Sequence, residues 1–109
     1  PECPHCGGVL RPDVVLFGEN LPEAAVQRFE AALAEGPDLV FSVGTGSAFP
    51  YIAGPVVWAA QQGIPTVEIN PGTTPVSDIV SMRLPLRAGE ALPALLDAAG
   101  LGLEGIRPD

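Results

Sequence analysis

The sequence has few basic residues, and this scarcity limits the partners that it can bind. Its 109 residues contain 5 lysines and arginines against 13 aspartates and glutamates, which gives a formal net charge of −8. A protein of this sign repels phosphates, so we expect no nucleic-acid partner. Cationic partners, such as protein segments that carry lysine, are not opposed by this charge.

Long apolar runs are also absent, and there are only two cysteines and one histidine. No run approaches the roughly 20 residues of a membrane-spanning helix, so we expect no membrane contact. Two cysteines three residues apart make no disulfide framework, and they favour a reducing cytoplasm where such a pair binds metal or does redox work. The sequence begins at Pro1, just before the cysteine motif, and has no initiator methionine. We therefore expect these residues to be part of a longer chain.

Glycine and proline are abundant, with 13 of each, and they divide the chain into short segments. Runs of strand length and character occupy residues 14–17, 39–43 and 66–69, and a last short strand is expected within residues 78–84. Apolar residues at helical spacing predict helices from about residue 20 to 36, from about 49 or 51 to 62, and from 88 to 99.

This order of strands and helices requires crossover connections and therefore a parallel sheet. The continuous apolar run at residues 39–43 is typical of a parallel strand covered on both faces. The pattern predicts half of a doubly wound nucleotide-binding fold.

The motif Cys3-Pro4-His5-Cys6 places two thiols at the spacing that clasps one tetrahedral metal ion. A structural zinc site needs four ligands, so this pair supplies half of one. Another chain or another segment would have to supply the rest. The alternative is a redox dithiol, and the glycines that follow favour the metal.

Two polar segments follow predicted strands at the edge where ligands of parallel sheets bind. Gly44-Thr45-Gly46-Ser47 lies between a strand and a helix, where hydroxyls and a helix N-terminus suit ribose or phosphate. Asn70 follows the next strand, and its amide can donate to and accept from ribose hydroxyls. An ordinary turn is the alternative for each segment.

Four motifs in this order resemble the sirtuin family, the NAD-dependent protein-lysine deacylases. They are CPHCGGVLRPDVVLFGENLP at residues 3–22, VGT at 43–45, EIN at 68–70 and AGEALP at 88–93. The resemblance spans nearly the whole chain, from about Cys3 to Ala99. It implies an α/β fold that contains half of a Rossmann-like parallel sheet with flanking helices, preceded by half of a zinc-binding knuckle.

The resemblance also implies the domain organisation and the roles of individual residues. Residues 1–12 would form the second half of a zinc-binding module, residues 13–100 the C-terminal half of an NAD-binding domain, and residues 101–109 a tail. The implied zinc ligands are Cys3 and Cys6. The implied NAD-binding residues, with Asn70 at the adenine-side ribose and Ala88 near adenine, are Gly44, Thr45, Gly46, Ser47, Asn70 and Ala88.

The resemblance assigns the acyl-lysine substrate to the segment before the first helix. Val15 and Phe17 would form the walls of an apolar tunnel, and the Val15 carbonyl would accept a hydrogen bond from the substrate amide. Gly18, Glu19 and Asn20 would belong to a strand to which the substrate peptide pairs. From the residues alone, Val15 and Phe17 would be core, and Glu19 a solvated loop charge.

The chain departs from the family pattern in its NAD loop and in which of the family's motifs it contains. Gly46 takes the place of the family's serine, so Ser47 is the candidate replacement, and Tyr51 stands where many members have proline. The family's first glycine-rich loop, catalytic histidine and first cysteine pair precede the matched region. The resemblance therefore implies an enzyme that converts NAD and acyl-lysine to nicotinamide, O-acyl-ADP-ribose and lysine, and we expect this chain alone to be inactive.

Two functions of other classes remain open from the sequence. One is a non-catalytic module that binds NAD or ADP-ribose, and the other is a zinc-dependent interaction module. A missing N-terminal half or a partner chain would complete the site in the enzymatic interpretation.

Overall fold

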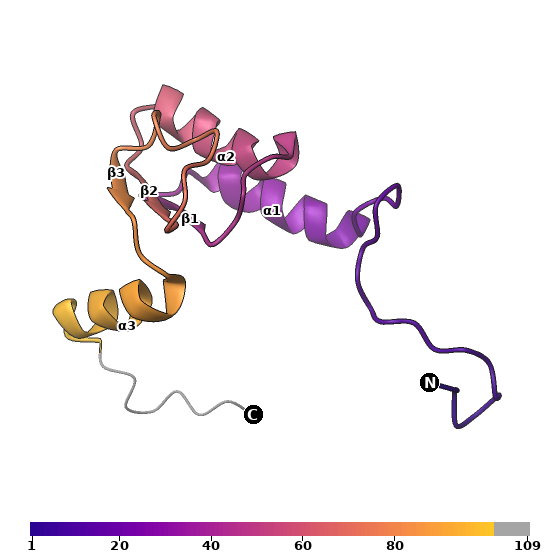
Figure 1. The fold of residues 1–109 in the computed structure, drawn as a ribbon. Coiled ribbons are helices and arrows are strands. Elements are labelled where there is room, and N and C mark those ends of the chain that lie inside the picture. The colour runs from indigo at the N-terminus through magenta and orange to yellow at the C-terminus, as the bar shows by residue number, and fades with distance from the viewer. Residues whose placement is uncertain (102–109) are drawn as a thin grey trace. The chain divides into compact units, whose positions relative to one another are not determined.

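The computed structural model describes residues 1–101 and divides the chain into two compact units, Pro1–Glu35 and a second unit from Gly36 onward. The first unit holds helix α1 (Glu23–Glu35), and the second holds a sheet with two helices (Figure 1). None of the helices in this described part combines the length and apolar character needed to span a bilayer.

Helix α1 confirms the helix predicted from about residue 20 to 36. The carbonyl of Pro22 accepts the amides of Ala25 and Val26, and Gln27 Nε2 donates to Glu23 Oε1 one turn earlier at 3.1 Å. Gly36 ends the helix with φ of 84°, a left-handed conformation that favours glycine. No residue of α1 is fully buried.

The second unit is built on a parallel sheet, as predicted. Its strands β1 (Val40–Val43), β2 (Thr66–Ile69) and β3 (Met82–Leu84) lie in the order β1-β2-β3 and pair in parallel. Val43 is opposite Ile69, which is opposite Leu84, so the three strands end side by side.

Helices α2 (Pro50–Gln61) and α3 (Ala88–Ala98) complete the second unit. Helix α2 packs against β1 and β2, and it begins with Pro50 in the first turn, where the missing amide costs no hydrogen bond. The buried apolar core is small and lies in this unit: Val56, Ala59, Ile69, Val76 and Ala91.

The structure corrects two expectations about strands. Residues 14–17 form no strand: the amide of Val14 donates to the carbonyl of Pro12 at 2.9 Å, the chain turns at Phe17 and Gly18, and the segment pairs with no other strand among the described residues. The run at 39–43 does contain β1, but it is not covered on both faces. Ser42 is buried, whereas Phe41 is 46% exposed and Val43 36% exposed, so only one face of β1 is covered.

The predicted domain boundaries at residues 12 and 100 stay predictions. The structure divides the chain after Glu35. Most of the predicted tail, residues 102–109, lies outside the described residues.

Candidate functional site

The glycine-rich loop begins directly at the end of β1. The amide of Gly44 donates to the carbonyl of Ile69 at 2.9 Å, which extends the pairing with β2 by one bond. Gly44 has φ of 62°, and this left-handed conformation turns the chain away from the sheet. Thr45 is half-buried and Gly46 is exposed, so part of the loop backbone before the first residue of α2 is accessible.

Ser47, the candidate replacement for the family's serine, has its side chain turned into the fold. It is 2% exposed, and its Oγ lies 3.3 Å from the Oγ of Ser42 on β1. Its backbone has φ of 48°, and its amide donates to Thr45 Oγ1 at 3.3 Å. Because this side chain is buried, its hydroxyl is not accessible at the surface, and the role of Ser47 in binding NAD stays a prediction.

Asn70 joins the two polar segments that the sequence places at the sheet edge. Its Nδ2 donates to the carbonyl of Thr45 at 2.9 Å, and its Oδ1 accepts the amide of Gly72 at 2.9 Å. Its backbone amide donates to Leu84 at 3.1 Å, which continues the pairing with β3. The structure therefore brings Thr45 and Asn70 together at the carboxyl end of the sheet.

Two further positions that the sequence singled out, Ala88 and Tyr51, take no part in the hydrogen bonds between the loops of Thr45 and Asn70. Ala88 is half-buried at the first position of α3, and none of the hydrogen bonds described for residues 1–101 links it to the loops of Thr45 and Asn70. Tyr51 stacks on Phe49 at the start of α2, with ring centroids 5.6 Å apart. The role of Ala88 near adenine stays a prediction.

In the first unit, Arg11 and Glu19 form an ion pair that also bonds to the backbone of the predicted substrate segment, and we call this pair the Arg11–Glu19 clasp. The guanidinium forms a two-pronged ion pair, with Nη1 at 2.7 Å from Oε1 and Nη2 at 3.0 Å from Oε2. Nη2 also donates to the carbonyl of Val14 at 2.6 Å, and Glu19 Oε2 accepts the amide of Leu16 at 3.0 Å. Glu19 is exposed in the loop, as the residues alone predict, and its carboxylate also pairs with Arg11 and accepts a hydrogen bond from the backbone of the segment.

The clasp leaves Val15 and Phe17 at the surface. Phe17 is 93% exposed and Val15 is 43% exposed, so the expectation from the residues alone that both are core is wrong. Gly18, with φ of 85°, forms the turn between them and Glu19. Exposed apolar side chains on a fixed loop are compatible with the predicted contact to an acyl chain, and that contact stays a prediction.

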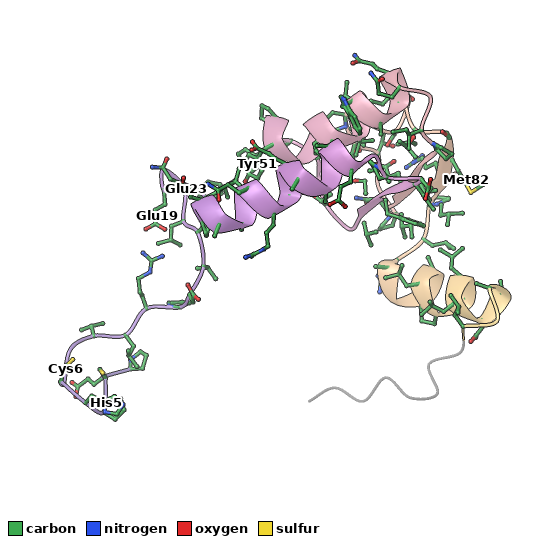
Figure 2. The ribbon with its side chains drawn as sticks, turned by 180° about the vertical axis from the view of Figure 1, so that it is seen from behind. His5, Cys6, Glu19, Glu23, Tyr51 and Met82 are labelled. Atoms are coloured by element: carbon green, nitrogen blue, oxygen red, sulfur yellow. The ribbon has the colours of Figure 1, made fainter. Side chains whose placement is uncertain are left out.

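The cysteine motif forms a tight turn. The amide of Gly7 donates to the carbonyl of Cys3 at 2.8 Å, and the amide of Cys3 donates to that of Gly8 at 2.7 Å. Hydrogen bonds from the His5 and Cys6 amides, and a further one from the Cys6 side chain, lower the pKa of Cys3. Figure 2 shows His5 and Cys6 in this N-terminal loop.

Both cysteines are free thiols, and residues 1–101 hold no group of three or more metal-ligating side chains. The two thiols would supply two of the four ligands of a tetrahedral zinc site. Binding of zinc stays a prediction.

Sequence reasoning missed three charged residues that organise these loops. Arg11 and Arg83 were not singled out, because a lone arginine in a turn-rich segment carries no local signal. Glu68 carried one usable signal, since an acidic residue within the apolar strand Thr66–Ile69 requires a partner if the strand is buried. It is fully buried in the structure.

The Arg11–Glu19 clasp gives a first testable prediction, on pH. Arg11, followed by the Leu16 amide, lowers the pKa of Glu19 below its ordinary value of 4.5. Because this pKa is lowered in the folded chain, the clasp is fully formed above 4.5 and is lost as the pH falls through the lowered pKa. We expect the NMR signal of the Leu16 amide to stay constant from about pH 7 to about pH 5 and to move only at lower pH.

The variant Glu19→Gln is the control for this titration, because it removes the titrating group and keeps the size of the side chain. The Leu16 signal should then lose its acid transition. A transition at or above the ordinary glutamate value would contradict the clasp.

Comparison with known proteins supports the family that the motifs resemble. Residues 1–49 match the model of the Sir2 family. The chain is 46% identical over 96 residues to NAD-dependent protein deacylase 2 of Pseudomonas aeruginosa, covering 88% of this chain and 38% of the relative. It is also 46% identical over 96 residues to NAD-dependent protein deacylase Sir2 of Mycolicibacterium smegmatis, covering 88% and 39%.

Solved structures of Sir2 proteins have the same fold as this chain. A Sir2 homologue in complex with NAD superposes with a TM-score of 0.78 at 33% identity, covering 92% of this chain and 39% of that one. A Sir2 protein with a p53 peptide and NAD⁺ gives 0.73 at 27% identity, covering 94% and 42%. The chain belongs to the Sir2, or sirtuin, family, and it spans about two-fifths of the length of these relatives.

Proposed function

We propose that this chain carries part of the NAD site and the acyl-lysine segment of an NAD-dependent protein deacylase. The observation that carries the proposal is the hydrogen bond from Asn70 Nδ2 to the carbonyl of Thr45. It joins the two segments that the family resemblance assigns to NAD, at the sheet edge where ligands of parallel sheets bind. The relatives' names and the NAD complexes support the same substrate.

In this proposal each loop has a separate task. The exposed backbone around Gly44 and Gly46 approaches the dinucleotide, and Asn70 offers its remaining amide hydrogen and lone pair to a ribose. The clasped segment from Val15 to Glu19 pairs with the substrate peptide, as complexes of Sir2 relatives with acylated peptides support. The products are nicotinamide, O-acyl-ADP-ribose and free lysine, and the base that this reaction needs comes from outside these residues.

We also propose that Cys3 and Cys6 hold a structural zinc ion together with a second pair of ligands. Zinc there would cross-link the turn to another segment and would take no part in the reaction. A cytoplasmic location, in which the two thiols stay reduced, belongs to the same proposal.

An NMR titration of the 109-residue chain with ADP-ribose tests the site. We expect saturable chemical-shift changes of the Gly44 and Thr45 amides and of the Asn70 side-chain amide. The Kd should be on the order of 1 mM, because these residues form only part of the proposed NAD site. Nicotinamide alone is the control ligand, since Asn70 is assigned to the adenine-side ribose, and it should leave these signals in place. Shifts confined to other residues, or none at all, would refute the proposal.

A further inference from the structure

The proposed function leaves unused the one carboxylate that is fully buried among the described residues. The Glu68 side chain is 1% exposed in the middle of β2. Its Oε1 accepts the hydroxyl of Thr74, and its Oε2 accepts the hydroxyl of Ser77 at 2.6 Å. The side-chain Nε of Arg83 on β3 lies 3.3 Å from Oε2. Both oxygens therefore have partners, all from the segment that follows Asn70.

The guanidinium of Arg83 connects this carboxylate to the loop after β2. While Nε faces Glu68, Nη2 donates to the carbonyl of Gly72 at 2.5 Å and lies 3.4 Å from Thr73 Oγ1. Because the guanidinium is planar, the contact with Glu68 fixes the direction in which Nη2 points. The carboxylate thus determines where the Gly72 peptide is held.

Gly72 passes this restraint on to Asn70. Its carbonyl is held by Arg83, and its amide donates to Asn70 Oδ1 at 2.9 Å. That bond fixes which way the Asn70 amide faces, and the Nδ2 at its other end donates to Thr45. A continuous series of contacts therefore runs from the buried carboxylate to the glycine-rich loop.

We propose that Glu68 and Arg83 are positioning residues for the adenine-ribose end of the nucleotide site. They act through Gly72 on the orientation of Asn70, without touching the nucleotide. This inference rests on the proposed function, because it assumes that Asn70 faces a ribose. A purely structural role predicts something different: any cation beside Glu68 would then serve equally well.

The variant Arg83→Lys separates the two roles. Lysine keeps a positive charge for Glu68, but it has no second nitrogen in a fixed plane to reach Gly72. We expect the 109-residue chain to keep its melting temperature within about 3 °C, while the Kd for ADP-ribose rises about five- to tenfold. The Asn70 side-chain amide signals should move toward each other, and their hydrogen exchange should quicken.

Two further variants complete the test. Glu68→Gln should weaken ADP-ribose binding by a similar factor, because the neutral amide no longer orients Arg83. Arg28→Lys, at an exposed position on α1, is the matched control and should leave the Kd unchanged. An unchanged Kd and unchanged Asn70 signals in Arg83→Lys would overturn the inference.

The design keeps this inference separate from the proposed function. If the unmodified chain binds no ADP-ribose, the proposed site fails, and the Asn70 signals still decide whether Arg83 orients that amide. If the unmodified chain binds and Arg83→Lys binds equally well, the site stands and the positioning role is refuted.

Discussion

Replacing Asn70 by alanine is expected to weaken binding of ADP-ribose at least about tenfold, which corresponds to about 1.4 kcal/mol. The change removes the donor to Thr45 and the acceptor for Gly72, so both loops lose the bond that joins them. It also removes the group that we assign to the ribose. A loss of one hydrogen bond to a preorganised loop and one to the ligand accounts for this magnitude.

Two variants show which part of Asn70 matters. Asn70→Asp keeps an acceptor for Gly72 but has no hydrogen to donate to Thr45, and its charge repels the phosphates of the ligand. It should therefore bind as weakly as the alanine variant. Gln61→Ala, at an exposed position near the end of α2, is the control and should bind like the unmodified chain. Binding by Asn70→Ala within twofold of the unmodified chain would contradict the assigned role.

A second large effect concerns catalysis. The only histidine of the sequence, His5, lies between the two cysteines that we assign to zinc. The reaction needs a general base at a ribose hydroxyl, and no other imidazole is available in these residues. We therefore expect the 109-residue chain to show no deacylase turnover, whereas the same residues should be active when the rest of a relative's chain is supplied.

The helices and strands were predictable because the chain marks them locally. Gly36 and Pro37 end α1, and the strand Thr66–Ile69 lies between a proline turn and an asparagine turn. The strand predicted at residues 14–17 was wrong for a physical reason: β-prone side chains form a strand only when another strand pairs with them. Here a clasp between residues eight apart in sequence holds the backbone instead.

The candidate site was predictable only in part. Thr45 and Asn70 could be placed together, because parallel strands bring their carboxyl ends to one edge of the sheet. The network behind Asn70 could not be predicted, since Glu68 binds Thr74 and Ser77 in a loop whose path no local pattern encodes, and Arg83 on the strand that follows this loop. The inward turn of Ser47 was not predicted either: its hydroxyl meets that of Ser42 on β1, five residues earlier.

A chimera makes the central claim testable as catalysis. The 96 matched residues of the Pseudomonas aeruginosa deacylase would be replaced by those of this chain, with the relative supplying the remainder. A second chimera carrying Asn70→Ala is the matched variant, and one carrying Gln61→Ala is the control.

The deciding measurement is NAD-dependent release of lysine from an acetylated peptide by the chimera and by the 109-residue chain. We expect turnover by the chimera that requires NAD, a kcat/KM for NAD at least about tenfold lower with Asn70→Ala, and none by the chain alone. A folded chimera without turnover, or NAD-dependent turnover by the isolated chain, would contradict the account.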